Sequence, residues 1–82
     1  MGHELLCNVR SEGKTASGKA LLETNEIIVR GVLRLRIPFT SLESVVARDG
    51  ELHLKWPEGS AVLELGEQAE KWALSVAHDM SG

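Results

Sequence analysis

The feature that most constrains this chain is a change in the spacing of its apolar residues at Gly66. Before Gly66, from Leu5 to Leu65, apolar residues recur at short spacing, and turn residues interrupt them about every six to ten positions. This pattern is typical of an antiparallel β-meander. After Gly66 the apolar residues follow the period of a helix. The chain is therefore expected to be mainly β with one C-terminal α-helix.

Seven short strands are predicted from this pattern, near residues 4–10, 16–23, 26–30, 33–38, 43–48, 51–56 and 60–65. The helix is predicted over residues 67–80, where it closes one open end of the sheets. Its apolar stripe consists of Ala69, Trp72, Ala73, Val76, Ala77 and Met80. Trp72 lies in the middle of the stripe and is expected to anchor the helix.

A hairpin is predicted at Asp49-Gly50, because this pair tolerates the positive φ angles of a two-residue primed turn. Counting outward from the turn sets Arg48 opposite Glu51 and Val46 opposite His53. One face of the hairpin then collects the apolar side chains of both strands, namely Val45, Ala47, Leu52, Leu54 and Trp56.

The next turn is predicted as a four-residue loop over residues 57–60. This length sets leucines opposite one another on the apolar face, Leu54 with Leu63 and Leu52 with Leu65. A three-residue loop would set Leu52 opposite Glu64 and is rejected. Turns are also expected at Asn25-Glu26 and Gly31-Val32, and Pro38, which has no amide donor, is expected at a strand end or a sheet edge.

Composition points to one domain, expected over residues 1–82, with 43% apolar and 26% charged residues. The formal net charge of −3 argues against a protein that mainly neutralises nucleic-acid phosphates. Cys7 is the single cysteine, so neither an internal disulfide nor a cysteine zinc cluster can form. Because the sequence shows no export signal and no transmembrane stretch, we expect a cytoplasmic protein.

Two stretches and one tryptophan resemble the pleckstrin-homology superfamily in its bacterial and GRAM-type branches. Residues 18–31 form a Gly-led strand, a turn with Thr24 and a second strand, and residues 37–45 match the pattern I-P-x-x-x-[LI]-x-x-V. Trp72 resembles the helix tryptophan of that fold. The resemblance implies a seven-stranded antiparallel barrel or sandwich of two sheets capped by the helix. Members of this superfamily bind phosphoinositides, peptides or proteins, so the fold alone assigns no function.

Three arginines, Arg30, Arg34 and Arg36, form the candidate binding site. Arg34 and Arg36 point the same way on one predicted strand, and Arg30 lies just across the Gly31 turn, so three guanidinium groups can hold a phosphate or carboxylate. The alternative, which we favour at this stage, is a solvated strand face whose charge is neutralised by Glu23 and Glu26.

Other basic residues do not match the pattern of the phosphoinositide-binding members. In those members the basic residues lie on the first two strands and their loop, whereas here Arg10, Lys14 and Lys19 lack the R-x-R pattern and Glu12 lies among them.

Charge is also uneven along the chain. Residues 1–50 carry seven basic and six acidic groups, net +1, and residues 51–82 carry two and six, net −4.

No group of residues indicates catalysis, a metal or a cofactor. The histidines, His3, His53 and His78, lack the spacing of a metal site, and Cys7 is expected to be a buried, inert thiol. The sequence lacks nucleophile-elbow, Walker and dinucleotide-binding motifs, and Glu67 and Glu70 suit the start of a helix.

Phe39, Trp56 and Trp72 fall at core positions and offer no platform for nucleic-acid bases. We therefore expect a small non-catalytic interaction module that binds a protein. The alternative is binding of an anion, a phosphoinositide or a nucleic acid through Arg30, Arg34 and Arg36. Peripheral membrane contact and self-association stay open.

Overall fold

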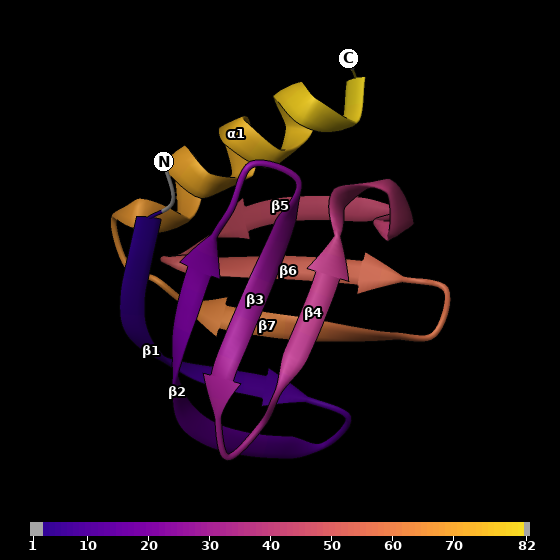
Figure 1. Cartoon of the computed structure of the whole chain (residues 1–82). Helices are drawn as coiled ribbons and strands as arrows, with labels where there is room; N and C mark the ends of the chain where they lie inside the picture. The colour runs from indigo at the N-terminus through magenta and orange to yellow at the C-terminus, as the bar shows by residue number, and fades with distance from the viewer. Residues whose placement is uncertain (1–2, 82) are drawn as a thin grey trace.

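The computed structural model describes residues 3–81 and contains seven strands and one C-terminal helix, as predicted (Figure 1). In chain order the elements are β1 (His3–Ser11), β2 (Lys14–Leu22), β3 (Glu26–Gly31), β4 (Leu35–Pro38), η1 (Phe39–Ser41), β5 (Ser44–Arg48), β6 (Glu51–Trp56), β7 (Gly59–Glu64) and α1 (Gln68–Ser81). The short 3-10 helix η1 follows Pro38, which ends its strand as expected. No helix in the described part of the chain is long and apolar enough to cross a membrane.

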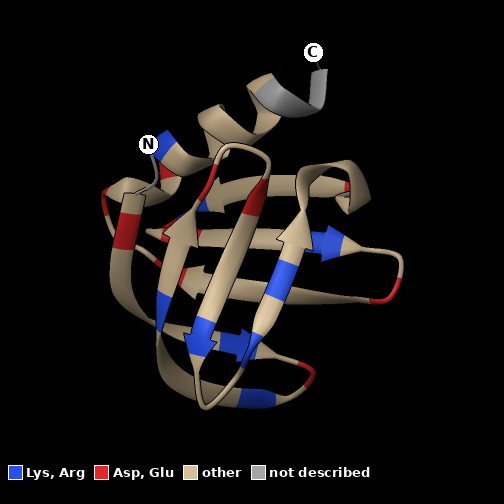
Figure 2. Ribbon diagram, in the orientation of Figure 1, with Lys and Arg blue, Asp and Glu red and all other residues tan. Residues whose placement is uncertain are grey.

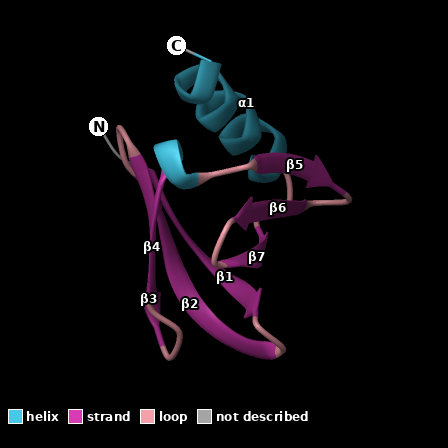
Figure 3. Ribbon diagram, turned by 90° about the vertical axis from the view of Figure 1, so that its right-hand side faces the viewer, coloured by secondary structure: helices cyan, strands magenta, loops and turns pink. Residues whose placement is uncertain are grey.

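All seven strands belong to one antiparallel sheet in the order β4-β3-β2-β1-β7-β6-β5. The two expected sheets are the two halves of this sheet, because β1 pairs with both β2 and β7. Strand β1 pairs with β2 along the whole length of β1, but only residues 9–11 of β1 pair with β7. The halves diverge from this junction, as the side view shows (Figure 3). Strands β1–β4 form one wall, and β5–β7 cross behind it in the view of Figure 1.

The register of the β5–β6 hairpin is confirmed, with Arg48 opposite Glu51 and Val46 opposite His53. Asp49 and Gly50 have φ angles of 50° and 76°, as a primed turn requires. Glu12 and Gly13, with φ angles of 52° and 79°, form a second turn of this kind between β1 and β2.

The predicted four-residue loop between β6 and β7 is wrong. Trp56 pairs with Gly59, so the turn has two residues, Pro57 and Glu58, and Leu52 lies opposite Leu63. Proline suits the first central position of a turn with negative φ angles, and neither central residue has a positive φ. The register differs from the predicted one by two residues, which leaves the same side chains facing the core.

The core lies between the two walls and under α1, which packs against β5, β6 and η1. Trp72 is 2% exposed and sits among the largest buried side chains. The buried apolar residues are Val9, Ala20, Leu22, Ile27, Val29, Ile37, Phe39, Leu42, Leu52, Leu54, Ala61, Leu63, Leu65, Ala69, Trp72 and Val76. The helix stripe is narrower than predicted, because Ala73 is half-buried and Ala77 is exposed, while the side chain of Met80 lies outside the described part.

Candidate binding surface

The three arginines lie on the outer face of the β1–β4 wall, which is the face turned away from the core. In β3, Ile27 and Val29 are buried while Arg30 is exposed, and in β4 the same alternation leaves Arg36 exposed. Arg34 is exposed immediately before β4. Because side chains alternate between the faces of a strand, these positions place all three arginines on one side of the sheet.

Lys19 also lies on this surface, although it is not among the residues predicted from the sequence to form the site. The β2–β3 register sets Lys19 directly opposite Arg30, and the β1–β2 register sets Leu6 opposite Lys19. Arg34 continues the line one step beyond the last β3–β4 pair. We call Lys19, Arg30 and Arg34 the basic row; Figure 2 shows Lys and Arg residues on the neighbouring strands β2, β3 and β4.

Two glycines bring β2 and β3 close together beside the basic row. A Cβ atom on Gly18 would lie 2.7 Å from the carbonyl oxygen of Arg30, and Gly31 has a φ of 144°. Only glycine fits such a close approach without a shift of the backbone. The backbone of Arg30 is thereby fixed against β2.

Arg36 is paired, as the sequence analysis expected of this face. Its Nε and Nη2 atoms donate to the two carboxylate oxygens of Glu26 at 2.6 and 3.2 Å. This hydrogen bond holds the pKa of the Glu26 carboxyl below its ordinary value and raises the pKa of the Arg36 guanidinium. Arg36 is therefore not part of the basic row.

The basic row keeps most of its charge. Among the described side chains, Arg30 and Arg34 form no ion pair and no side-chain hydrogen bond, and Glu23 neutralises neither. Lys19 has only a long contact, 3.8 Å from its Nζ to the Glu4 carboxylate, with both side chains well exposed. Like charges directly opposite each other on a sheet repel, so this arrangement costs stability.

Two shallow hollows flank Arg30 on the outer face. One has a volume of about 570 Å³ and is lined by residues that include Ile28, Arg34 and Arg36. The other, of about 750 Å³, is lined on the β1–β2 side by residues that include Leu6, Ser17 and Lys19. Leu6 is 82% exposed, so an apolar side chain stands at one end of the basic row.

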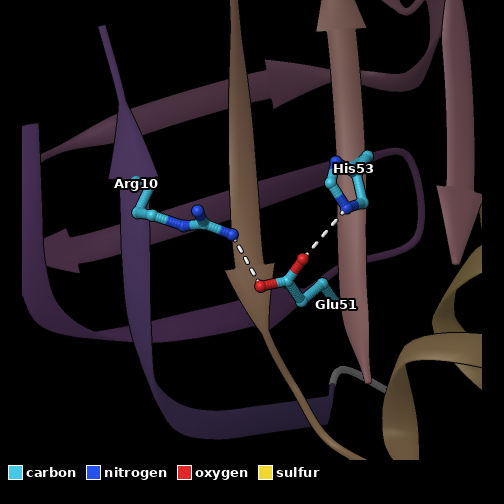
Figure 4. Close-up of polar contacts among 3 residues, drawn as sticks. All are labelled: Arg10, Glu51 and His53. Carbon is cyan, nitrogen blue, oxygen red and sulfur yellow. Dashed lines mark hydrogen bonds and ion pairs between the residues drawn. The ribbon is translucent and has the colours of Figure 1, made fainter. Parts of the chain in front are cut away.

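A separate polar cluster lies on the outer face of the other half of the sheet (Figure 4). Glu51 on β6 reaches across β7 and accepts from Arg10 Nη2 at 2.6 Å, and its other oxygen lies 3.2 Å from His53 Nε2. Arg10 is thereby neutralised by a carboxylate from a distant part of the chain. This cluster carries no excess of charge comparable to that of the basic row.

Cys7 is half-buried, and burial together with the nearby Glu64 carboxylate raises the pKa of its thiol. A raised pKa disfavours the reactive thiolate. A buried thiol was predicted, whereas Cys7 is only partly buried against the core, on the part of β1 that does not pair with β7. Within the described residues, no three His, Cys, Asp or Glu side chains gather into a metal-binding group.

Comparison with known proteins supports the fold. No protein-family model and no curated protein sequence matches the chain. The N-terminal PH domain of human ARAP2 is similar in structure, with a TM-score of 0.76 at 10% identity over 98% of this chain and 79% of that one. A structure of the Vav1 exchange factor, which concerns its PH and C1 domains, has a TM-score of 0.69 at 14% identity. This chain is covered to 96% in that match and spans about a quarter, 25%, of the Vav1 chain.

The chain thus has a pleckstrin-homology-like fold, as the resemblance of its sequence implied. The bacterial or GRAM-type branch stays a prediction.

Proposed function

We propose that this chain is a non-catalytic interaction module, a single cytoplasmic domain over residues 1–82, that binds an acidic segment of a partner protein through the basic row. The observation that carries the proposal is the excess positive charge of Lys19, Arg30 and Arg34 on an exposed face. A carboxylate-rich ligand would relieve their mutual repulsion, and the planar guanidinium groups suit carboxylates.

A protein partner fits this surface better than a nucleic acid. Phe39 and Trp72 are buried and Trp56 is partly buried, so no aromatic platform for bases stands beside the row. The exposed Leu6 next to Lys19 combines apolar and basic contacts, and arginine is enriched in protein interfaces. The net charge of −3 also disfavours a polyanionic duplex as the ligand.

The second candidate is an anionic membrane surface, favoured by one observation. Val32 is 86% exposed at the tip of the β3–β4 turn, between Arg30 and Arg34. An apolar tip flanked by cations suits the boundary between lipid headgroups and acyl chains.

The test is an NMR titration of the protein with a short Glu-rich peptide. We expect chemical-shift changes confined to the outer face around Leu6, Lys19, Arg30 and Arg34, and binding that weakens as salt is raised. A double variant with Arg30→Glu and Arg34→Glu should lose binding while its melting temperature does not fall below that of the wild type. The matched control, Lys55→Glu with Lys71→Glu, reverses two exposed cations elsewhere and should bind as the wild type does.

Equal loss of binding in both double variants, or no binding by the wild type, would contradict the proposal. Vesicles with anionic lipid and a single-stranded oligonucleotide serve as parallel probes. Tighter binding to vesicles than to the peptide, lost in Val32→Ser, would establish the second candidate instead.

A further inference from the structure

A groove lies where the sheet does not close on itself. The outermost strands, β4 and β5, do not pair with each other, and the chain passes from one to the other through η1. Here a groove of about 470 Å³ is lined by β4, by residues 40–43 and by the β6–β7 turn. Ligand pockets commonly have volumes of about 300–1,000 Å³. No residue of the basic row lines this groove, so it is a separate candidate site.

The floor of the groove is apolar and exposes part of the core. Trp56 lies on the same face of β6 as Leu52 and Leu54, which are buried, but Trp56 itself is only partly covered. On β4, Leu35 is likewise only partly covered, whereas Ile37 on the same face is buried. Both partly covered side chains line the groove. An indole in this position offers a ligand an apolar surface and a π face.

The charged side chains that line the groove leave it acidic. They are Arg36, Glu43 and Glu58, and Arg36 is already bound to Glu26. Glu43 and Glu58 are exposed and form no ion pair and no side-chain hydrogen bond with any described side chain. Lys55, on the same hairpin as Glu58, pairs with neither carboxylate and does not line the groove. Two carboxylates are therefore available to a ligand.

The backbone brings both carboxylates into the neighbourhood of the indole. The N–H of Glu43 donates to the carbonyl of Lys55 at 2.7 Å, which ties the segment before β5 to the residue next to Trp56. Glu58 belongs to the two-residue turn that joins Trp56 to Gly59. The two carboxylates thus come from separate segments of the chain that meet at the end of β6.

We infer that this groove binds an arginine side chain carried by an apolar and basic segment of a partner protein. A guanidinium group stacks on a tryptophan face and pairs with carboxylates, and the aliphatic stem of arginine suits an apolar floor. The choice of a cation rests on charge complementarity with Glu43 and Glu58. The inference does not depend on the basic row, which attracts ligands of the opposite charge.

An NMR titration with the peptide acetyl-Leu-Arg-Leu-amide tests the inference. The matched peptide has citrulline in place of arginine, which keeps the shape of the side chain and removes its charge. We expect the indole N–H signal of Trp56 to move while that of the buried Trp72 does not. The arginine peptide should bind at least about fivefold more tightly than the citrulline peptide.

Equal binding of the two peptides would show that the groove accepts apolar side chains whatever their charge, and would overturn the inference. A Trp56 signal that stays unmoved up to about 10 mM arginine peptide would overturn it as well. Failure of the Glu-rich peptide to bind the basic row would leave these results unchanged, so the two proposals can fail separately.

Two double variants test the role of the carboxylates. Glu43→Gln with Glu58→Gln removes both charges at nearly the same size and should weaken binding of the arginine peptide at least about fivefold. The citrulline peptide should bind this variant as it binds the wild type. Glu64→Gln with Glu70→Gln, the matched control, removes two exposed carboxylates elsewhere and should not weaken the arginine peptide. Equal weakening in both variants would show that net charge attracts the peptide, and the groove would not be its site.

Discussion

At the scale of single residues, the outer face of the β1–β4 wall divides its arginines into two kinds. Arg36 is bound to Glu26, whereas Arg30 and Arg34 have no acidic partner among the described side chains. The sequence could not separate them, because the choice of partner depends on which strand positions lie diagonal to one another. The sequence also shows no direct sign that Lys19 belongs to the site. Its place opposite Arg30 follows only from the register between the predicted strands 16–23 and 26–30, counted outward from the turn that joins them.

The Arg36–Glu26 pair predicts a pH effect. The pKa of Glu26 is lowered chiefly by the hydrogen bond from Arg36, so the folded carboxyl takes up a proton less readily than the unfolded one. The pair therefore stabilises the fold at pH values above the titration of the unfolded carboxyl, and this contribution is lost as the pH falls through the folded pKa. In a carbon-13 NMR titration, Arg36→Gln should raise the pKa of Glu26 toward its ordinary value.

Arg34→Gln is the matched control, because Arg34 makes no contact with Glu26 in the structure and its loss should leave the pKa of Glu26 unchanged. An identical titration of Glu26 in the wild type and in Arg36→Gln would show that the pair does not persist in solution.

At the scale of elements, the helix is held to the sheet by its tryptophan. Trp72 is 2% exposed, and α1 covers the end of the core between the two walls. Trp72→Ala should lower the free energy of unfolding by about 3–5 kcal/mol, because it leaves a large cavity in a small core. Urea denaturation measures the change. Leu74→Ala, on the exposed side of the same helix, should change it by less than about 0.5 kcal/mol. Similar effects of the two substitutions would mean that the helix docks on another face.

Local signals explain which elements could be predicted. The Asp49-Gly50 turn fixed its own register, because its backbone angles allow only one pairing of the flanking strands. The Pro57-Glu58 turn did not, because two alternatives that differ by two residues bury the same face and hydrophobicity cannot distinguish them. The junction of β1 with β7 joins residues about fifty positions apart and has no local signal at all.

At the scale of the whole molecule, the two halves of the sequence differ in charge, net +1 for residues 1–50 and net −4 for residues 51–82. The structure places the basic row on one wall and β5–β7 with α1 on the other side of the core. The overall charge is negative, yet Lys19 and Arg30 are direct cross-strand neighbours about 5 Å apart, where a local interaction exceeds the screened field of distant carboxylates. The basic row should therefore behave as a local site.

Because the basic row sets like charges next to one another, it should lower the stability of the fold if it serves binding. A purely structural role would instead require that the row stabilise the fold. Arg30→Gln removes repulsion with Lys19, so at low salt we expect the free energy of unfolding to rise by roughly 0.2–1 kcal/mol, while affinity for the Glu-rich peptide falls. The gain should shrink at about 1 M salt, where the screening length is about 3 Å. Arg10→Gln, which breaks the 2.6 Å contact with Glu51, should instead give no gain in stability and leave peptide binding unchanged. If Arg30→Gln lowers stability and binds the peptide as the wild type does, the basic row serves the fold and the proposed binding surface is wrong.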